Sequence, residues 1–487
     1  MTKERRCTVY IHLDRSSSTP LWQQIVNGII QKIHTNTLNP DDQLTPSRVL
    51  AQELNVSRST VQLAYDELLA RGYVSTSRRG GTKVISSDYN AASPPHQNEP
   101  PFALPTRPHF DEAEKQMDHW LSANQFHDTL EIDFRHQEPA IDDHFQNIWK
   151  RSLLKALQRL NMKDWGYSSP HGLWEVRSEI RQYLSVERGI DIEEDQIVLT
   201  GGTQQAIDLI SQVMLKKGDT VAVEDPGFPG ARLSFLHREM TIYPAPVDEE
   251  GMMVNTLPER TKLIAVTPSH QRPTGVCMSV NRRRELLQFA AKAQSYILED
   301  DFDGDYRYHG GPLPSLFSEA PDHVIYIVSF SKVLAPGIRL AAIIGSKAVI
   351  KEIAALQSLI QRQLPIMEQI TLASFFREGE FTRYVRRMRQ VYKKRQAAMM
   401  DALLTHHFDK HFRLYGTDTG LHVFLEGTSD FDEQGTIEAA KAAGVGIYPL
   451  SPYCYESKRK GLLLGFACTD EAMIQEGVRR LKQTLHI

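Results

Sequence analysis

The stretch Ser329-Phe330-Ser331-Lys332-Val333-Leu334-Ala335-Pro336-Gly337-Ile338-Arg339 places one lysine in an informative setting. The apolar residues 324–328 before it predict a buried strand, so a serine-rich turn presents Lys332 at the carboxyl end of that strand. A lysine held there can lose its proton and form a Schiff base with an aldehyde, which is how proteins hold pyridoxal phosphate (PLP). Arg339 has a fork of donors that suits a phosphate. The alternative is a surface lysine in a polar loop, and other stretches of the chain argue against it.

Length and composition limit the class of protein. The chain has 487 residues, 41% of them hydrophobic, which is enough for more than one globular domain. Its 4 cysteines (Cys7, Cys277, Cys454, Cys468) are scattered without metal-ligand spacing, so neither a disulfide framework nor a metal site is expected. No apolar run has the length of a signal peptide or a membrane span, so we expect a cytoplasmic protein that does not enter a membrane.

The net charge of -4 is unevenly distributed. Residues 1–85 contain 11 Lys and Arg against 7 Asp and Glu, a net charge of about +4, which leaves about -8 for the remainder. A small basic unit joined to a mildly acidic body indicates that only the first part of the chain meets a polyanion.

Three helices are predicted in this basic unit. Apolar residues recur at helical spacing over 21–33, and residues 46–54 predict a short second helix with Thr45 as N-cap and Pro46 at the first helical position. After a tight connection, Ser57 is expected to cap a third helix over 58–69. Two short helices joined in this way form a helix-turn-helix, whose second helix offers its first-turn side chains to the major groove.

A hairpin is predicted directly after the third helix. Segments 73–77 and 82–85 flank Arg78-Arg79-Gly80-Gly81, which gives a wing with a basic, flexible tip able to reach the minor groove or a phosphate. A winged helix used for protein contacts, or a solvated basic face, is the alternative. The polar residues cluster at the third helix's first turn and at the wing tip, which favours DNA.

The remainder of the chain divides into a linker and a large unit. Residues 87–109 are rich in proline and predict a semi-extended linker. Over residues 110–487, short apolar runs alternate with helical patterns. The predicted strands are residues 196–200, 220–224, 263–267, 296–299 and 324–328. This alternation predicts an α/β fold with a mostly parallel central sheet and with ligands at the carboxyl ends of its strands.

Three further stretches follow predicted strands. Thr200-Gly201-Gly202-Thr203 leads from a strand into a helix, whose free amides and positive end suit a phosphate. Asp300 follows residues 296–299, and a carboxylate there can keep a pyridine nitrogen protonated. The proline-rich turn of residues 267–275 presents side chains above the sheet. Taken alone, the first two are also compatible with a ligand-free turn and a helix-capping acidic turn.

Together with Lys332, these stretches occur in the order found in fold-type I aminotransferases, which residues 110–487 resemble. Residues 15–86, with Leu-x-Pro-Ser-Arg-x-Leu-Ala and Val-Ser-Arg-x-Thr-Val, resemble the GntR-type winged helix-turn-helix. The whole chain therefore resembles the MocR/GabR family. That resemblance implies a PLP-dependent transcription regulator that senses an amino acid, an amine or a PLP vitamer. It also implies a head-to-tail, domain-swapped homodimer that binds an operator with two half-sites or direct repeats.

The resemblance further implies roles for single residues. Lys332 would hold PLP as an internal aldimine, and Asp300 would pair with the ring nitrogen. The phosphate would be bound by Gly202, Thr203, Ser329 and Arg339. Tyr167 would reach the phosphate bound in the partner subunit, and His270 and Phe228 would lie near the ring. DNA would be contacted by Arg48, Ser57, Arg58 and Thr60, with Arg78 and Arg79 from the wing.

Several departures from the family pattern bear on the effector. Phe302 and Phe228 each replace a common tyrosine, and Arg272 replaces the asparagine of true aminotransferases. Leu463 stands where many relatives have an arginine for an amino acid's carboxylate. Arg272, Arg459 or Arg135 could substitute, the effector could be something other than an ordinary α-amino acid, or PLP itself could be the signal. An active aminotransferase carrying a DNA reader is the alternative function, and these departures argue against efficient catalysis.

Overall fold

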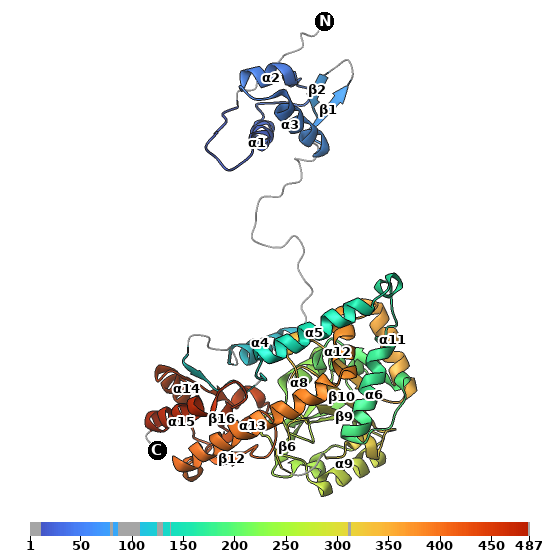
Figure 1. The fold of residues 1–487 in the computed structure, drawn as a ribbon, viewed down its shortest axis with the longest axis vertical. Helices are drawn as coiled ribbons and strands as arrows, with labels where there is room; N and C mark the ends of the chain where they lie inside the picture. Colours follow the sequence, from blue (N-terminus) through green and yellow to red (C-terminus); the bar gives the residue numbers. More distant parts are fainter. Residues whose placement is uncertain are drawn as a thin grey trace. The chain divides into compact units, whose positions relative to one another are not determined.

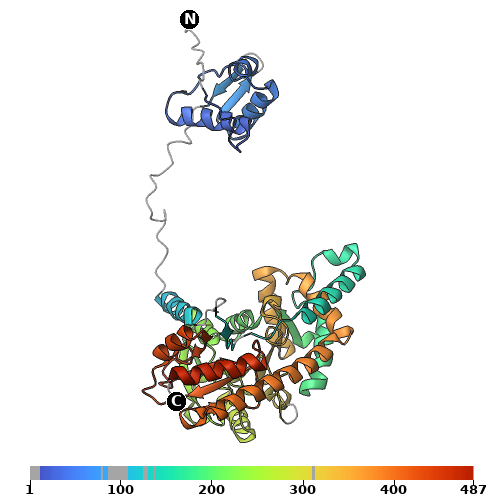
Figure 2. The same ribbon diagram turned by 60° about the vertical axis from the view of Figure 1, so that its left-hand side comes forward.

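The computed structural model describes residues 11–77, 81–85, 108–123, 130–136, 138–309 and 313–485. The chain forms two compact units, Met1–Pro105 and Thr106–Ile487, each with a hydrophobic core of its own (Figures 1 and 2). Within these described ranges, no helix combines the length and the apolar character that crossing a membrane requires.

The N-terminal unit is a winged helix-turn-helix, as predicted. Its elements are α1 (Leu21–His34), α2 (Ser47–Glu53), α3 (Arg58–Ala70) and the antiparallel pair β1 (Val74–Ser77) and β2 (Gly81–Val84). Ile25 and Ile29 of α1 pack with Val61 and Leu68 of α3 in a core from which water is excluded. The hydrophobic periodicity of these two helices therefore determines how they pack.

The two predicted helix caps have different outcomes. Ser57 caps α3 as expected, since its hydroxyl accepts the backbone N–H of Thr60 at 3.1 Å. The predicted cap of α2 was wrong, because Pro46 remains extended (ψ 138) at the N-cap position and the helix begins at Ser47. The carbonyl of Thr45 instead accepts the hydroxyl of Tyr65 at 2.6 Å. A tertiary contact with α3 thus holds Thr45 outside the helix.

An eight-stranded sheet forms the centre of the large unit, in the order β4-β11-β10-β9-β8-β5-β6-β7. The strands are β4 (Ile197–Thr200), β5 (Thr220–Asp225), β6 (Thr241–Asp248), β7 (Gly251–Met252), β8 (Thr261–Val266), β9 (Tyr296–Asp301), β10 (Val324–Ser329) and β11 (Ala341–Ile344). Strands β10, β9, β8, β5 and β6 pair in parallel, whereas β11 runs antiparallel between β10 and β4. The five predicted strands and the mostly parallel sheet are confirmed.

A second, four-stranded sheet lies near the C-terminus. It consists of β12 (Arg413–Tyr415), β13 (His422–Glu426), β16 (Gly461–Gly465) and β15 (Tyr448–Pro449), and a short pair joins β3 (Ile132–Asp133) to β14 (Val445–Gly446). Figures 1 and 2 show the C-terminal elements, including α14, α15 and β16, gathered at one end of the large unit.

Helices surround both sheets. They are α4 (Pro108–Ala123), α5 (Asp143–Arg159), α6 (Trp174–Arg188), α7 (Thr203–Met214), α8 (Pro229–His237), α9 (Val280–Ala293), α10 (Leu316–Glu319), α11 (Lys347–Gln361), α12 (Ile366–Arg377), α13 (Glu380–Thr405), α14 (Glu433–Ala442) and α15 (Glu471–Leu485). Helix α4 begins at Pro108, within the residues predicted as linker. Proline is well suited to the first turn of a helix, where its missing N–H is not needed.

The sheet topology brings the predicted motifs together. The carboxyl ends of the parallel strands β9 and β10 meet at one edge of the sheet, where Asp300 and Ser329 lie. Strand β4 runs in the same direction, since β11 is antiparallel to both β4 and β10, and it delivers Gly202 to that edge. Segments separated by more than a hundred residues therefore meet at one edge of the sheet, and we call the region around Lys332, Asp300 and Arg272 at this edge the chamber.

Candidate functional site

An anion-binding cradle lies at the start of α7. Gly202 occupies the N-cap position with φ +103 and no side chain caps the helix, so its first amides stay available. The guanidinium of Arg339 lies against this glycine, because a Cβ at Gly202 would approach Nη2 of Arg339 to 2.7 Å. Thr203 opens the helix, and the buried Ser329 ends β10. A positive helix end beside a guanidinium fits a phosphate.

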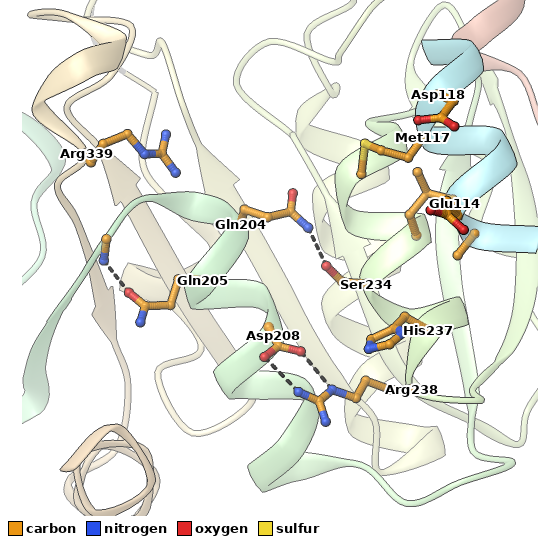
Figure 3. A pocket seen from close by; sticks show the side chains of 13 residues that line it. Glu114, Met117, Asp118, Gln204, Gln205, Asp208, Ser234, His237, Arg238 and Arg339 are labelled. Carbon is orange, nitrogen blue, oxygen red and sulfur yellow. Dashed lines mark hydrogen bonds and ion pairs between the residues drawn. The ribbon is translucent and has the colours of Figure 1, made fainter. Parts of the chain in front are cut away.

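The cradle opens into a cavity of about 630 Å³ between α4, α7 and α8, whose lining includes Gly201 and Arg339 (Figure 3). In Figure 3, Gln204 donates to Ser234, and Gln205 accepts the N–H of Gly201. These bonds hold the first turn of α7 in place. The guanidinium of Arg339 therefore lies beside an N-terminus of α7 whose position these hydrogen bonds fix.

Lys332 lies half-buried in the turn after β10. Burial, and after it the positive charge of Arg272, lower the pKa of the Lys332 amine to about 7, whereas Asp303 and Glu138 act in the opposite direction. An amine with this pKa has a substantial neutral fraction near pH 7, and the neutral amine is the form that attacks a carbonyl carbon. The surroundings of Lys332 therefore favour the form of the amine that a nucleophile needs.

Two buried carboxyl groups line a small cavity beside the ring of Phe228. Oδ1 of Asp300 and Oε1 of Glu224 are buried without hydrogen-bond partners in the structure. Burial raises the pKa of each carboxyl to about 7. The other oxygen of Glu224 accepts the hydroxyl of Thr267 at 2.6 Å. An unsatisfied carboxylate oxygen at this depth calls for a cationic N–H donor, and a protonated pyridine nitrogen meets that need.

Arg272 lies between two aromatic rings in the same chamber. Its guanidinium carbon is 4.5 Å from the centre of Phe228 and 5.6 Å from that of Phe302. Its charge acts on the titration of both Lys332 and Asp300, so it lies within electrostatic reach of each. Phe228 and Phe302, which each replace a common tyrosine, thus both contact Arg272, which replaces an asparagine.

A cluster of imidazoles adjoins the chamber, and of its members the sequence had indicated His270 alone. Nδ1 of His270 lies 2.6 Å from Asp303, and its ring stacks on Phe302. His422 contacts His270 and its Nε2 lies 2.7 Å from the carbonyl of Pro273; burial lowers the pKa of His422 to about 3. Nε2 of His136 lies 2.8 Å from the hydroxyl of Tyr453. No motif links these positions, so their partnership depended on the fold.

Three predicted residues are engaged elsewhere or lie at the surface. Arg135 forms an ion pair with Asp133 at 3.0 Å, and Arg459 forms one with Glu426 at 2.5 Å. Tyr167 is 81% exposed, with the guanidinium of Arg362 over its ring at 4.7 Å. Arg135 and Arg459 therefore have ionic partners of their own, and Tyr167 lies at the surface of its chain.

The predicted DNA-contacting residues lie on the surface of the N-terminal unit. Arg48 on α2 and Arg58 at the start of α3 are exposed, and Thr60 is half-buried. The hydroxyl of Ser57 is 2.7 Å from that of Thr60, so both are partly occupied in shaping the helix start. Arg78 and Arg79 lie outside the described residues.

Comparisons with known proteins match both units. Residues 133–481 match the family model of aminotransferase class I and II, and residues 21–84 match that of bacterial regulatory proteins of the gntR family. Among curated proteins, an uncharacterized HTH-type transcriptional regulator, YdeL of Bacillus subtilis (strain 168), is 33% identical over 96% of this chain and 98% of its own length. The probable rhizopine catabolism regulatory protein MocR of Rhizobium meliloti is 30% identical over 96% of this chain and 94% of its own.

Solved structures resemble the large unit. The α-aminoadipate aminotransferase LysN from Thermus thermophilus, complexed with N-(5'-phosphopyridoxyl)-L-leucine, has a TM-score of 0.67 at 26% identity and covers 76% of this chain and 94% of that one. The kynurenine aminotransferase of Pyrococcus horikoshii has a TM-score of 0.68 at 25% identity and covers 82% of this chain and 98% of that one.

Proposed function

Because this chain belongs to the MocR family of transcriptional regulators, which join a GntR-type helix-turn-helix to an aminotransferase class I and II domain, we propose that it is a PLP-dependent regulator. It reads DNA with its N-terminal unit and senses a small molecule in the chamber around Lys332. We assign residues 15–86 to the DNA reader, 87–109 to the linker and 110–487 to the sensing domain. A regulator of this kind works where the DNA is, in the cytoplasm.

The observation that carries this proposal is that a half-buried Lys332 with a lowered pKa, an Asp300 with an unsatisfied oxygen and a phosphate cradle lie at the same edge of the sheet. In our assignment, the Lys332 amine would hold PLP through its carbonyl carbon, with the carbonyl oxygen released as water, and Asp300 would hold its ring nitrogen. Phe228 packs on the ring and His270 lies behind Phe302. The phosphate is bound by Gly202, Thr203, Ser329 and Arg339. When bound, the cofactor supplies an electron-withdrawing ring and a reactive carbonyl.

We further propose a homodimer in which Tyr167 of each subunit reaches the cradle of the other in a head-to-tail, domain-swapped arrangement. Apolar side chains at the surface around Tyr167 support an interface there. Exposed apolar side chains in the neighbouring segments of the chain include Met162 (90%) and Trp165 (58%) before Tyr167, and Trp174 (59%) after it. A dimer presents two copies of α3, so its operator contains two half-sites or direct repeats.

The aminotransferase alternative has less support from the site. Arg135 and Arg459 are already paired with acids, and Leu463 is fully buried in an apolar cluster. In the described residues these positions therefore offer no cation for a substrate carboxylate. Incubating the purified protein with a panel of amino acids tests this directly, since an enzyme would convert its cofactor to the pyridoxamine form.

Absorption spectroscopy and DNA capture test the proposal together. Purified full-length protein should absorb visible light, borohydride should fix the chromophore to the chain, and Lys332→Ala should abolish both effects. Genomic fragments captured by the wild-type protein should share a motif with two half-sites. A protein that stays colourless when saturated with PLP, or that enriches no motif, would contradict the assignment.

A further inference from the structure

Helix α3 has an outward face that extends beyond its first turn. The residues of its inward face, Val61, Ala64, Tyr65 and Leu68, are buried in the core of the N-terminal unit. Because successive residues of an α-helix are rotated by about 100°, the opposite face consists of Ser59, Gln62, Leu63 and Asp66, and all four are exposed. Gln62 and Leu63 thus follow the first turn on the side that faces away from the protein.

The amide of Gln62 is held in one orientation. Its Nε2 donates to Oδ1 of Asp66 at 3.0 Å, one turn further along the helix. A carboxylate accepts hydrogen bonds, so the nitrogen of the amide, and not its oxygen, faces Asp66. Within the described part of the chain this is the hydrogen bond that the amide makes, which leaves one N–H and the oxygen Oε1 for a ligand. In the major groove this pair of groups matches adenine, which accepts at N7 and donates from N6.

Leu63 is an apolar side chain on an otherwise polar face. It is 50% exposed, whereas Val61 and Leu68 on the inward face are completely buried. The apolar group that a base presents in the major groove is the methyl group of thymine. Contact with that methyl would remove the leucine side chain from water, which stabilises a complex. An A·T pair presents both the groups that suit Gln62 and the methyl that suits Leu63.

The charges on α3 argue against phosphate as the ligand of this face. Arg58 begins the helix, whereas Asp66 lies eight residues further on, about 12 Å along the helix axis. A carboxylate beside Gln62 repels phosphate groups, and neither Gln62 nor Leu63 carries a positive charge. The outward face beyond the first turn therefore suits base edges rather than the DNA backbone.

We propose that Gln62 and Leu63 read A·T base pairs in each half-site of the operator, Gln62 through N6 and N7 of adenine and Leu63 through the methyl group of thymine. This inference rests on the proposed function, because it assumes that α3 enters the major groove. A neutral amide and an apolar side chain add little electrostatic affinity, so these two residues act on which sequence is preferred.

Base-pair replacement tests the role of Gln62. Each A·T pair in a half-site of the captured DNA is changed to G·C, and fluorescence anisotropy gives the dissociation constant for the full-length protein. At one position the change should weaken wild-type binding about tenfold, whereas Gln62→Ala should bind both DNAs about equally. Gln62→Arg should prefer G·C at that position, since arginine pairs with N7 and O6 of guanine.

Gln52, an exposed glutamine on α2, provides the control for Gln62, and Gln52→Ala should keep the wild-type preference. If Gln62→Ala weakens binding to every DNA by the same factor, the residue contacts no base and the assignment is overturned. A failure of the proposed function looks different, because the wild type then captures no motif, or Arg58→Ala leaves DNA binding unchanged.

Deoxyuridine, which lacks the methyl group of thymine, tests the role of Leu63. Replacing the thymines of the half-site one at a time should weaken wild-type binding about fourfold at one position, which is the effect of burying one methyl-sized group. Leu63→Ala should bind the thymine and deoxyuridine forms equally. Leu69→Ala, at an exposed leucine near the other end of α3, is the control and should still discriminate between them. Undiminished discrimination in Leu63→Ala would overturn the assignment of Leu63.

Discussion

The DNA-reading face of α3 and the chamber around Lys332 are built in opposite ways. Ser57, Arg58 and Thr60 are neighbours in sequence, lie at or near the surface, and are set by one helix start. The chamber joins Gly202, Asp300 and Lys332 from the ends of three separate strands, and burial shifts the pKa of its ionisable groups. The start of α3, built from one segment, presents its charge to solvent. The chamber, built from several segments, excludes water from its charged groups and thereby shifts their pKa.

The largest expected effect concerns Asp301, the neighbour of Asp300 on β9, whose side chain lies on the opposite face of the sheet. Oδ2 of Asp301 accepts from Nε of Arg188 at 2.7 Å and from the hydroxyl of Tyr326 at 2.5 Å. Although burial opposes it, Arg188 holds the pKa of Asp301 below its ordinary value. Asp301→Asn should therefore lower the free energy of unfolding by about 3 kcal/mol, since it leaves a buried guanidinium undercompensated. Urea unfolding measures this change.

Asp300→Asn should behave in the opposite way. Above its pKa of about 7, Asp300 carries a buried charge with an unsatisfied oxygen, so the amide should raise the melting temperature of the cofactor-free protein. The same change should weaken PLP binding about tenfold. Calorimetry measures the melting temperature, and spectroscopic titration measures the affinity for PLP. Equal destabilisation by Asp300→Asn and Asp301→Asn would show that the chamber is an ordinary buried ion-pair network.

On the DNA-reading side, Arg58→Ala should weaken binding to the captured DNA by about 1–3 kcal/mol and leave the cofactor spectrum unchanged. Arg71 provides the matched control, since it lies at the other end of α3 and is paired with Glu67 at 2.7 Å. Arg71→Ala should change DNA affinity little. Fluorescence anisotropy at several salt concentrations measures both variants, and equal losses would refute the assignment of the α3 start to DNA.

The rate of PLP association should depend on pH. Both the neutral amine of Lys332 and the ionised carboxylate of Asp300 become more populated as pH rises through about 7, so the rate should rise there. In Arg272→Asn the midpoint should move upward, because removing this cation raises the pKa of both groups. Stopped-flow absorbance measures the profile. A midpoint unchanged by Arg272→Asn would place the guanidinium away from the reacting groups.

The smallest effect is expected at the cap of α3. Ser57→Ala removes the bond from the Thr60 N–H and should cost about 1 kcal/mol of helix stability, whereas Ser57→Asn keeps an acceptor there and should cost less. Hydrogen exchange of the α3 amides measures the difference. No change in exchange would mean that tertiary packing alone holds the helix start.

Much of the fold followed from patterns in the sequence. The winged helix-turn-helix and five strands of the large sheet agree with their predictions, because hydrophobic periodicity records which residues are buried. Strand β11 was not predicted. It has only four residues, and it runs antiparallel to its neighbour in a sheet whose predicted strands are parallel. The prediction that Thr45 caps α2 was wrong, because the hydroxyl of Tyr65 on α3 donates to the carbonyl of Thr45 and holds it outside the helix.

By itself, the sequence determined the candidate residues at the ends of the elements: a lysine, an acid and a glycine-rich turn at strand ends, and an arginine at a helix start. The tertiary structure alone decided their partners, including the imidazole cluster around His422, the carboxyl of Glu224 beside Asp300, and the aromatic cleft that holds Arg272. The physical reason is that motifs are contiguous in the chain, whereas burial, pairing and pKa depend on which distant segments exclude water together.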